Sequence, residues 1–264
     1  MRPHAPNQVK ELAGTVALVT GGAVRVGRAI ALALAEAGAD VAIGYHRSSA
    51  EARATVSELS ARGCRAVAIA ADIGKPAEAR GLIAKTVARL GRLDVLVNNA
   101  AIFTRTPFMA TTPAQFDRII AVNLRGAFFC AQAAARAMGR RGGRIVNIAD
   151  VGAVRAWPGY IPYGVSKAGI LMLTKGLAAA LAPRIQVNAV GPGVVLLPEG
   201  FPRAAAERLA DRIPMGRHGE PADVAAAVRF FATCPEYITG QVLFVDGAPR
   251  RSEARGRAVE APIC

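Results

Sequence analysis

Short apolar segments alternate with longer alanine-rich segments along most of the chain, and this alternation constrains the fold more than any other feature. The apolar segments lie at Val16–Thr20, Val41–Tyr45, Ala66–Ala70, Asp94–Val97, Arg144–Ile148, Ile185–Val190 and Val242–Val245. They are continuously apolar, which is typical of parallel strands covered on both faces. Helices are predicted between them near 26–37, 49–62, 76–90, 113–139, 162–182 and 221–232. The order predicts an α/β fold with a single Rossmann-type, doubly wound parallel sheet of about seven strands and helices on both faces.

The length of 264 residues favours one α/β domain over two. Residues 1–13 read as an N-terminal extension, residues 14–249 as the domain, and residues 250–264 as a polar C-terminal tail. Residues 194–214 are rich in proline and glycine and interrupt the rhythm of strands and helices. We expect this segment to form a flexible flap over a pocket.

Composition excludes several classes of protein. The net charge is +14, but 28 of the 33 basic residues are arginines scattered through every segment, without the basic and aromatic clusters of a nucleic-acid site. We therefore expect no nucleic-acid partner, although anionic phosphate ligands would be attracted. The N-terminus lacks an apolar signal region, and no uninterrupted run approaches the roughly 18 apolar residues of a membrane span. The four cysteines lack metal-ligand spacing, so we expect a cytoplasmic protein with reduced thiols and no metal site.

A glycine-rich turn follows the first predicted strand and leads into the first helix. Its sequence, Thr20-Gly-Gly-Ala-Val-Arg-Val-Gly27, allows a tight turn and a close backbone approach to a pyrophosphate at the helix N-terminus. Such a turn is also common for structural reasons alone. Arg25 is its unusual member, because it adds a guanidinium to a phosphate-binding turn.

The end of the second predicted strand indicates which dinucleotide is bound. NAD-specific sites usually place an acidic residue there to bind the ribose 2′-hydroxyl. This chain instead has Tyr45, His46, Arg47 and Ser48, which together with Arg25 suit a phosphate dianion. NADP(H) is therefore favoured over NAD(H). The alternative is that Arg47 merely opens a solvated helix.

An aspartate, a tyrosine and a lysine form the candidate proton-transfer group. Asp150 ends an apolar strand, and Tyr163 and Lys167 are four residues apart, so they share one face of a predicted helix. A neighbouring ammonium favours the phenolate, which suits a tyrosine acting as a general acid near neutral pH. The pair alone is a weak signal, and Asp150 could instead be a strand end that bonds the following turn.

Four further polar residues need an interpretation. Asp72 either accepts a bond from the adenine amino group or caps the helix that begins near Lys75. The amides of Asn98 and Asn99 can brace neighbouring strands. Asn123 lies within a predicted helix, where asparagine is a poor helix former, so it indicates a kink or a water relay unless it simply faces solvent.

Taken in order, these positions resemble the short-chain dehydrogenase/reductase superfamily from about residue 14 to residue 249. The motif positions are Thr20, Gly21, Gly27, Asn98, Asn99, Ala100, Asn123, Asp150, Tyr163, Lys167, Pro192 and Gly193. Three positions depart from the common pattern: Arg25 replaces a glycine, Ala101 follows the Asn-Asn-Ala run, and Asp150 replaces the usual serine. These departures, with the His46–Ser48 cluster, resemble the pteridine reductase branch.

The resemblance implies a site. Asp150, Tyr163, Lys167 and Asn123 would be catalytic, and Phe103, Ala101, Asp150 and Tyr163 would bind substrate. NADPH/NADP+ would be bound by Gly21, Arg25, Val26, Gly27, Tyr45, His46, Arg47, Ser48, Asp72, Ile73, Asn99, Ala100, Ala101, Lys167, Pro192, Gly193 and Val195. In that branch an aromatic ring at the position of Phe103 stacks on the pterin. Ala101 stands where a pterin-contacting serine is usual.

The resemblance also implies an activity, the reduction of a dihydropterin or dihydrofolate to its tetrahydro form by hydride transfer from NADPH. A carboxyl beside the tyrosine suits proton delivery to a C=N nitrogen, whereas a serine hydroxyl suits a ketone. The alternative enzyme is a carbonyl or imine reductase of the same superfamily, including one for 3-oxoacyl substrates. A non-catalytic NADPH sensor and a nucleic-acid-binding module are the other classes considered. The resemblance implies a homotetramer.

Overall fold

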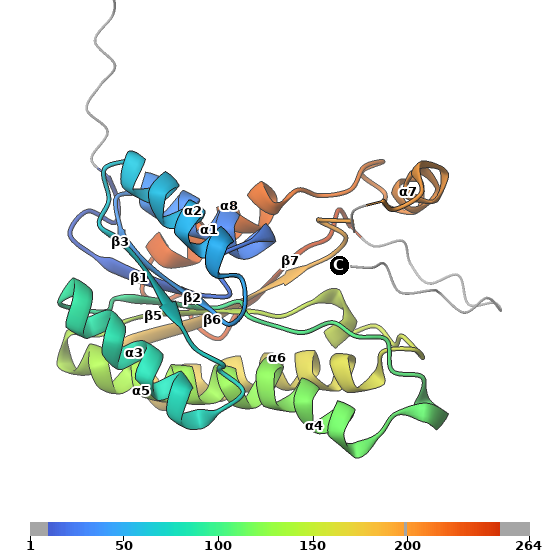
Figure 1. Cartoon of the computed structure of the whole chain (residues 1–264), viewed down its shortest axis with the longest axis horizontal. Helices are drawn as coiled ribbons and strands as arrows, with labels where there is room; N and C mark the ends of the chain where they lie inside the picture. The colour runs from blue at the N-terminus through green and yellow to red at the C-terminus, as the bar shows by residue number, and fades with distance from the viewer. Residues whose placement is uncertain (1–9, 198–199, 249–264) are drawn as a thin grey trace, which may run out of the picture.

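The computed structural model describes residues 10–197 and 200–248, which form one seven-stranded sheet between two layers of helices (Figure 1). All neighbouring strands are parallel, in the order β3-β2-β1-β4-β5-β6-β7. The strands are β1 (Val16–Thr20), β2 (Asp40–Tyr45), β3 (Ala66–Ala70), β4 (Val95–Asn98), β5 (Gly143–Ile148), β6 (Ile185–Pro192) and β7 (Val242–Val245). The order reverses between β1 and β4, which is where open α/β sheets place their ligands.

Helices cover both faces of the sheet. In Figure 1, α1 (Arg25–Glu36), α2 (Ser49–Ala61) and α8 (Pro221–Thr233) lie above it. Below it lie α3 (Pro76–Leu90), α4 (Pro113–Ile120), α5 (Ala127–Met138) and α6 (Ile161–Leu181). The short elements are η1 (Phe108–Ala110), η2 (Ala121–Gly126), η3 (Gly139–Arg141) and η4 (Val151–Ala153). The predicted fold class is confirmed, and each predicted strand ends within two residues of the observed one.

The two faces of the sheet carry separate apolar clusters. Strand residues that point to one face pack with α1 and α8, and those on the other face pack with α3 and α5. Val41 and Ala42, which are adjacent in β2, belong to different clusters because successive side chains of a strand point to opposite faces. Leu12, which precedes β1, is 4% exposed and belongs to the cluster beneath α1.

The helix predicted over residues 113–139 is interrupted. It consists of α4, a π-helical turn η2, and α5. Asn123 lies inside the π-helical turn, a local irregularity of the helix, and its 2% exposure shows that the solvent-facing alternative is wrong. Single π-helical turns are frequent at functional sites.

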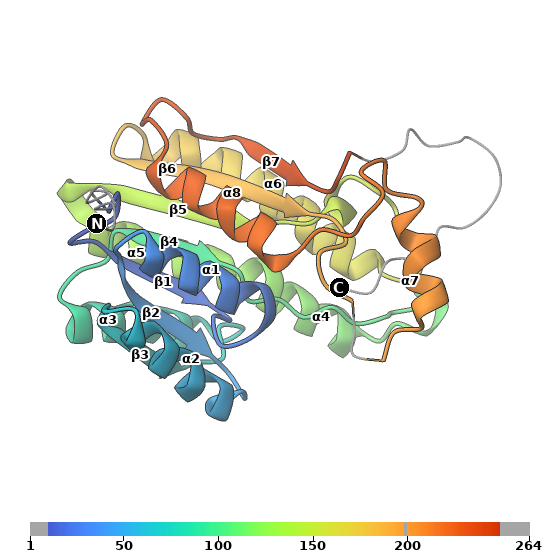
Figure 2. The same ribbon diagram turned by 90° about the horizontal axis from the view of Figure 1, so that it is seen from above.

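The predicted flap contains a helix that the sequence did not indicate. Helix α7 (Arg203–Ala210) stands apart from the two helical layers (Figure 2). In the described part of the chain, none of its residues is buried. Exposure of this kind agrees with a segment held to the domain by few contacts, while residues 198–199 and the predicted C-terminal tail fall outside the described residues.

Helix α6 qualifies as a membrane span by length and composition alone. Its 21 residues reach a mean hydropathy of 1.2 over an 18-residue window, of which 28% is buried. This does not contradict the expectation that no uninterrupted apolar run approaches the length of a membrane span, because the window average tolerates the isolated polar side chains of the helix. Those side chains, Tyr163, Ser166, Lys167 and Thr174, are buried and face the sheet, as in a core helix.

Candidate active site

One cleft of about 430 Å³ runs along the carboxyl ends of the strands. It is lined by residues that follow β1 to β6 and by two residues of α6. The predicted site residues that line it are Gly21, Arg25, Val26, Gly27, Tyr45, His46, Arg47, Ser48, Asp72, Ile73, Asn99, Ala100, Ala101, Phe103, Asp150, Tyr163, Lys167, Pro192 and Val195. Tertiary structure therefore brings residues from seven separate segments into one site.

The glycine-rich turn is packed tightly against the end of β4. Gly21 has φ +63°, and a Cβ there would lie 3.0 Å from the Ala100 Cα. A Cβ on Gly27 would lie 2.1 Å from the Gly21 carbonyl oxygen, so a side chain cannot be accommodated. The Asn99 amide donates to the carbonyl oxygens of Thr20 and Gly21, at 2.9 and 3.1 Å. These contacts hold the turn in the shape that a pyrophosphate requires.

The N-terminus of α1 suits an anion. Among the described residues, no side chain caps this helix end, and its first turn contains no acidic residue. Arg25 has φ +53°, a left-handed conformation that is uncommon for residues other than glycine. Strain of this kind persists where the surrounding structure requires it, often at ligand sites. The free backbone N–H groups, the helix dipole and the exposed guanidinium fit the pyrophosphate of a dinucleotide.

The end of β2 forms the exposed side of the cleft. His46 and Arg47 are exposed and Ser48 is half-buried, just before α2. All three line the same cleft as Arg25. The Asp72 carboxylate lies beside this segment, with its Oδ2 3.9 Å from the His46 Nε2. The arrangement offers a guanidinium, an imidazole and a hydroxyl to a ribose 2′-phosphate.

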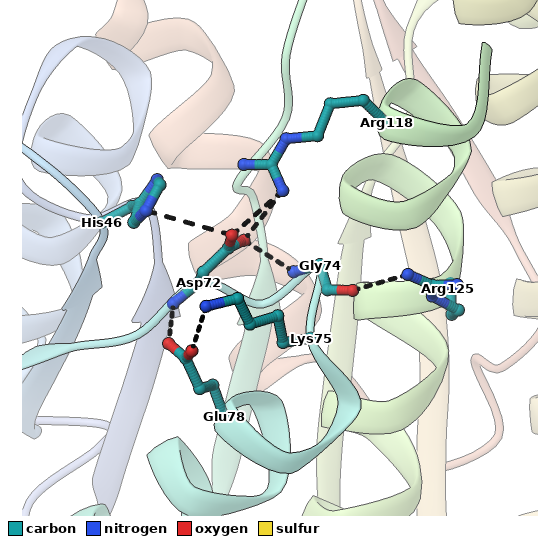
Figure 3. Close-up of polar contacts among 7 residues, drawn as sticks. All are labelled: His46, Asp72, Gly74, Lys75, Glu78, Arg118 and Arg125. Atoms are coloured by element: carbon teal, nitrogen blue, oxygen red, sulfur yellow. Dashed lines mark hydrogen bonds and ion pairs between the residues drawn. The ribbon is translucent and has the colours of Figure 1, made fainter. Parts of the chain in front are cut away.

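Asp72 follows β3 and makes polar contacts with several neighbouring residues (Figure 3). Its Oδ1 accepts from the Gly74 backbone N–H at 3.0 Å, and its Oδ2 lies 3.0 Å from Nη1 of Arg118 on α4. The predicted helix-cap alternative is wrong, because Lys75 occupies the N-cap position of α3 and Asp72 bonds a residue before it. Burial raises the pKa of Asp72, but the hydrogen bonds from Arg118 and Gly74 outweigh it, so the pKa lies below its usual value.

A buried hydrogen bond joins the two proton-transfer candidates. The Tyr163 hydroxyl on α6 donates to Oδ2 of Asp150 at 2.8 Å, and the two residues are 4% and 3% exposed. The other Asp150 oxygen, Oδ1, accepts from the Gly152 backbone N–H at 2.6 Å. Asp150 therefore holds the turn after β5, as the structural alternative supposed, and also contacts Tyr163.

Burial dominates the protonation of Asp150. It raises the pKa of the carboxyl above its ordinary value, although the Gly152 N–H, the Lys167 ammonium and the Tyr163 hydroxyl act in the opposite direction. The carboxyl therefore retains its proton to a higher pH than an exposed aspartate. Trp157 contributes to this burial, because its ring lies against Gly152, where a Cβ would come within 2.7 Å of it.

Lys167 lies beneath the tyrosine ring. Its Nζ donates to the Ile148 carbonyl oxygen at 2.8 Å and lies 5.7 Å from the centroid of the Tyr163 ring. The side chain is 3% exposed and lines the cleft. A buried ammonium anchored on a strand carbonyl supplies positive charge beside the tyrosine and a hydrogen-bond donor towards the cleft.

Asn123 lies behind the cleft and does not line it. Its amide oxygen accepts from the Ile102 N–H at 2.8 Å, and its Nδ2 donates to the Ile102 carbonyl and to the Ser166 Oγ. Ser166 in turn donates to the Tyr163 carbonyl oxygen at 2.6 Å. The π-helical turn therefore connects the loop after β4 to the helix that carries Tyr163. Gly193 also lies outside the cleft lining, because its backbone packs against Asp246.

Aromatic rings pack together around Tyr163, and two of them, Phe103 and Tyr163 itself, line the cleft. Phe103 stacks on Tyr160 at 4.4 Å between ring centroids, and it meets Tyr163 edge to face at 4.6 Å. Trp157 lies parallel to Tyr163 at 6.5 Å. The sequence indicated Phe103 but neither Trp157 nor Tyr160, because the loop after β5 has no motif or periodicity that places its rings.

Arg118 is the charged cleft residue that the sequence interpretation missed. It lies on α4, 46 positions after Asp72, and no motif connects the two. The uncharged residues missed in the lining are Val24, Gly44, Ala71, Ile102, Val122, Ile148, Ala149 and Leu196. Within residues 10–197 and 200–248, no group of three or more His, Cys, Asp or Glu side chains is placed to hold a metal ion.

Comparison with known proteins identifies what the whole chain is similar to. Residues 22–248 match a family model described as enoyl-(acyl carrier protein) reductase. The chain is 40% identical to a 3-oxoacyl-[acyl-carrier-protein] reductase of Synechocystis sp., over 89% of this chain and 97% of the relative.

Two solved structures share the fold and carry the dinucleotide. A blue fluorescent protein from a metagenomic library in complex with NADPH has a TM-score of 0.84 and 40% identity. A short chain dehydrogenase of Burkholderia cenocepacia in complex with NADP has the same two values. In both cases 90% of this chain and 98% of the other are covered. None of these relatives is a pteridine reductase, so the comparisons do not support that branch.

Proposed function

The chain belongs to the short-chain dehydrogenase/reductase superfamily, and we propose that it is an NADPH-dependent carbonyl reductase acting on 3-oxoacyl-type substrates. The observation that carries the proposal is the buried Tyr163–Asp150 pair at the end of the dinucleotide cleft, beside Lys167. The name of the 40% identical relative supports the substrate class.

Proton delivery is the task of the chain's own residues. When bound, the reduced nicotinamide supplies the hydride for the substrate carbon. Tyr163 holds the proton that the developing alkoxide needs, and Lys167 stabilises the negative charge left on the tyrosine oxygen. An ionised Asp150 would only accept hydrogen bonds, whereas a protonated Asp150 donates one, as a serine hydroxyl does to a carbonyl oxygen. Burial raises the pKa of Asp150 and so favours the protonated form, which is able to donate to a carbonyl oxygen.

Charge supports NADPH as the dinucleotide. Arg25 and Arg47 lie along the same cleft, and the end of β2 carries His46 and Ser48 where an NAD site would carry an acid. Two solved structures that are 40% identical to this chain hold NADPH or NADP, which supports the same choice of dinucleotide. We expect tighter binding of NADPH than of NADH.

Reduction of a C=N bond in a dihydropterin or dihydrofolate is the second candidate. Asp150 favours it, because an ionised carboxylate accepts N–H groups, which a pterin offers and a ketone lacks. Phe103 lies in the same cleft as Asp150, so it is available to stack on a flat heterocycle. One face of this ring, however, already contacts Tyr160.

Two variants at position 150 distinguish the candidates. The purified enzyme is assayed by NADPH oxidation with a 3-oxoacyl thioester, simple ketones, dihydrobiopterin, dihydromonapterin and dihydrofolate. Asp150→Asn keeps the acceptor for Gly152 and presents an N–H donor to the substrate, and Asp150→Ser presents a hydroxyl. A carbonyl reductase retains activity in both variants, whereas C=N reduction falls by roughly 10²-fold or more. Brisk turnover of dihydropterins alone by the wild type would overturn the carbonyl assignment.

We also propose a cytoplasmic homotetramer, which the family resemblance implies. Light scattering on the purified chain measures the mass, and a monomer at micromolar concentration would contradict the proposal.

A further inference from the structure

Asp72 places an acidic group next to the segment expected to bind the 2′-phosphate. Tyr45 at the end of β2 pairs with Ala70 at the end of β3, so the loops that follow these strands run side by side. The Ala71 N–H donates to the Tyr45 carbonyl oxygen at 2.8 Å, and the Asp72 carboxylate comes within 3.9 Å of the His46 imidazole. A carboxylate at the end of β2 disfavours binding of a 2′-phosphate, and the Asp72 carboxylate lies beside the end of β2.

Other charges near Asp72 are already paired. Glu78 accepts from the Asp72 backbone N–H and from the Lys75 ammonium, at 2.7 and 2.9 Å (Figure 3). That pair therefore leaves the charge of Asp72 itself uncancelled. The Arg118 guanidinium reaches across from α4 and contacts both carboxylate oxygens, at 3.0 and 3.3 Å.

We propose that Arg118 determines cofactor specificity by acting through Asp72: it cancels the carboxylate charge beside the His46–Ser48 segment, so that the 2′-phosphate of NADPH is not repelled. The inference rests on the proposed use of NADPH. In this role Arg118 acts only by neutralising Asp72, and it does not contact the reacting atoms. The lowered pKa of Asp72 agrees with it, because the carboxylate is ionised at neutral pH and needs a partner.

The size of the effect follows from charge and screening. Removing Arg118 would leave the Asp72 carboxylate ionised beside the His46–Ser48 segment, where we expect the 2′-phosphate. The separation is within a Debye length, which is about 8 Å at physiological ionic strength. NADH lacks that phosphate, so its affinity changes less. We expect the ratio of NADPH to NADH affinity to fall about tenfold, and the fall to shrink as ionic strength rises.

Arg125 provides a matched control. It lies in the π-helical turn and donates from Nη2 to the Gly74 carbonyl oxygen at 2.8 Å, so it ties down the same loop (Figure 3). Arg125→Met and Arg118→Met each remove one positive charge and one contact to this loop. Only Arg118→Met leaves a carboxylate without its guanidinium partner. If a loosened loop were the cause, both variants would lower the ratio of NADPH to NADH affinity equally. If the charge of Asp72 is the cause, only Arg118→Met lowers it.

Direct contact between Arg118 and the phosphate is the competing explanation, since Arg118 also lines the cleft and its side chain is 43% exposed. The double variant Arg118→Met/Asp72→Asn separates the two. If Arg118 acts through Asp72, removing the charge of Asp72 restores the ratio. A residue that binds the phosphate itself would not be rescued in this way.

The experiment measures dissociation constants of NADPH and NADH for the full chain, at low and high salt. The expected result is a tenfold lower ratio for Arg118→Met, a wild-type ratio for Arg125→Met, and recovery in the double variant. Arg118→Gln replaces Arg118→Met if the latter fails to fold. An unchanged ratio in a folded Arg118 variant, or a failed rescue, overturns the inference. A wild type without preference for NADPH overturns the proposed cofactor instead.

Discussion

The two ends of the cleft use opposite electrostatic means. At the reaction end, Asp150, Tyr163 and Lys167 are 3 to 4% exposed, and their polar atoms are held by buried hydrogen bonds. At the end where we propose that the adenosine lies, the side chains of His46 and Arg118 are 44% and 43% exposed, and both lie beside the Asp72 carboxylate. Catalysis at the buried end therefore depends on where a few protons lie. Binding at the exposed end depends on the sum of several charges.

This difference determines how substitutions should act. Buried hydrogen bonds in a low-dielectric site are strong and directional, so losing one disables the chemistry. Solvated charges are screened by water and salt, so losing one changes binding by degrees.

Tyr163→Phe should have the largest effect. It removes the hydroxyl that donates to Asp150 and keeps the ring that packs on Trp157 and Phe103. We expect kcat to fall by roughly 10²- to 10⁴-fold because the general acid is lost, while the dissociation constant of NADPH stays nearly unchanged. Steady-state kinetics and a binding titration check this, and near-wild-type turnover would remove Tyr163 from the mechanism.

Arg47→Asp should act on binding. It replaces a guanidinium with a carboxylate that repels the 2′-phosphate, so NADPH affinity should fall by about 10²-fold. The loss should be smaller at high salt, unlike the loss in Tyr163→Phe. Dissociation constants at two ionic strengths provide the measurement. If the wild type binds NADPH and NADH equally, Arg25 and the His46–Ser48 segment do not form a 2′-phosphate site.

Phe103→Ala should change substrate binding more than turnover. The ring contacts Tyr160 and Tyr163 and lines the cleft, so its loss removes apolar contact area from the substrate side. We expect KM to rise by roughly tenfold with a smaller loss in kcat. A matched measurement on Phe128→Ala, an exposed position on α5, should show neither change. A fall in kcat with KM unaltered would contradict a role in binding.

Asp150→Asn should give the smallest effect, an increase in stability at neutral pH. The pKa of Asp150 is raised in the folded state, so the folded protein favours the protonated form and loses stability as pH rises through that pKa. A neutral amide avoids this loss and still accepts from the Gly152 N–H. Tm should exceed that of the wild type near pH 7, by about 2–4 °C for each kcal/mol gained.

The difference in Tm should disappear under acidic conditions, below the unfolded pKa of aspartate, where both side chains are neutral. Thermal unfolding from pH 4 to pH 8 measures it. A lower Tm for the variant at every pH would show that the carboxyl is retained for its hydrogen bonds and not merely tolerated.

The order of elements and the motif positions could be predicted because both are local. Continuous apolar runs identify parallel strands, and the glycines, Tyr163 and Lys167 follow from spacing along one segment. Asn123 was identified by its poor fit to a helix, and it lies in a π-helical turn. Helix α7 was not predicted, because proline and glycine around it mask a short helical stretch.

The sequence was enough to predict the sheet and to nominate the proposed dinucleotide turn and the proton-transfer candidates, since each depends on neighbours within about one element. Only folding brings Asp72 to its partners, packs Trp157 and Tyr160 around Phe103, and buries Asp150. Arg118 and Asp72 meet across 46 positions because α4 packs beside the loop after β3. Charges that are far apart in the chain interact only after folding brings them within a few ångströms, so spacing along the sequence carries no signal of them.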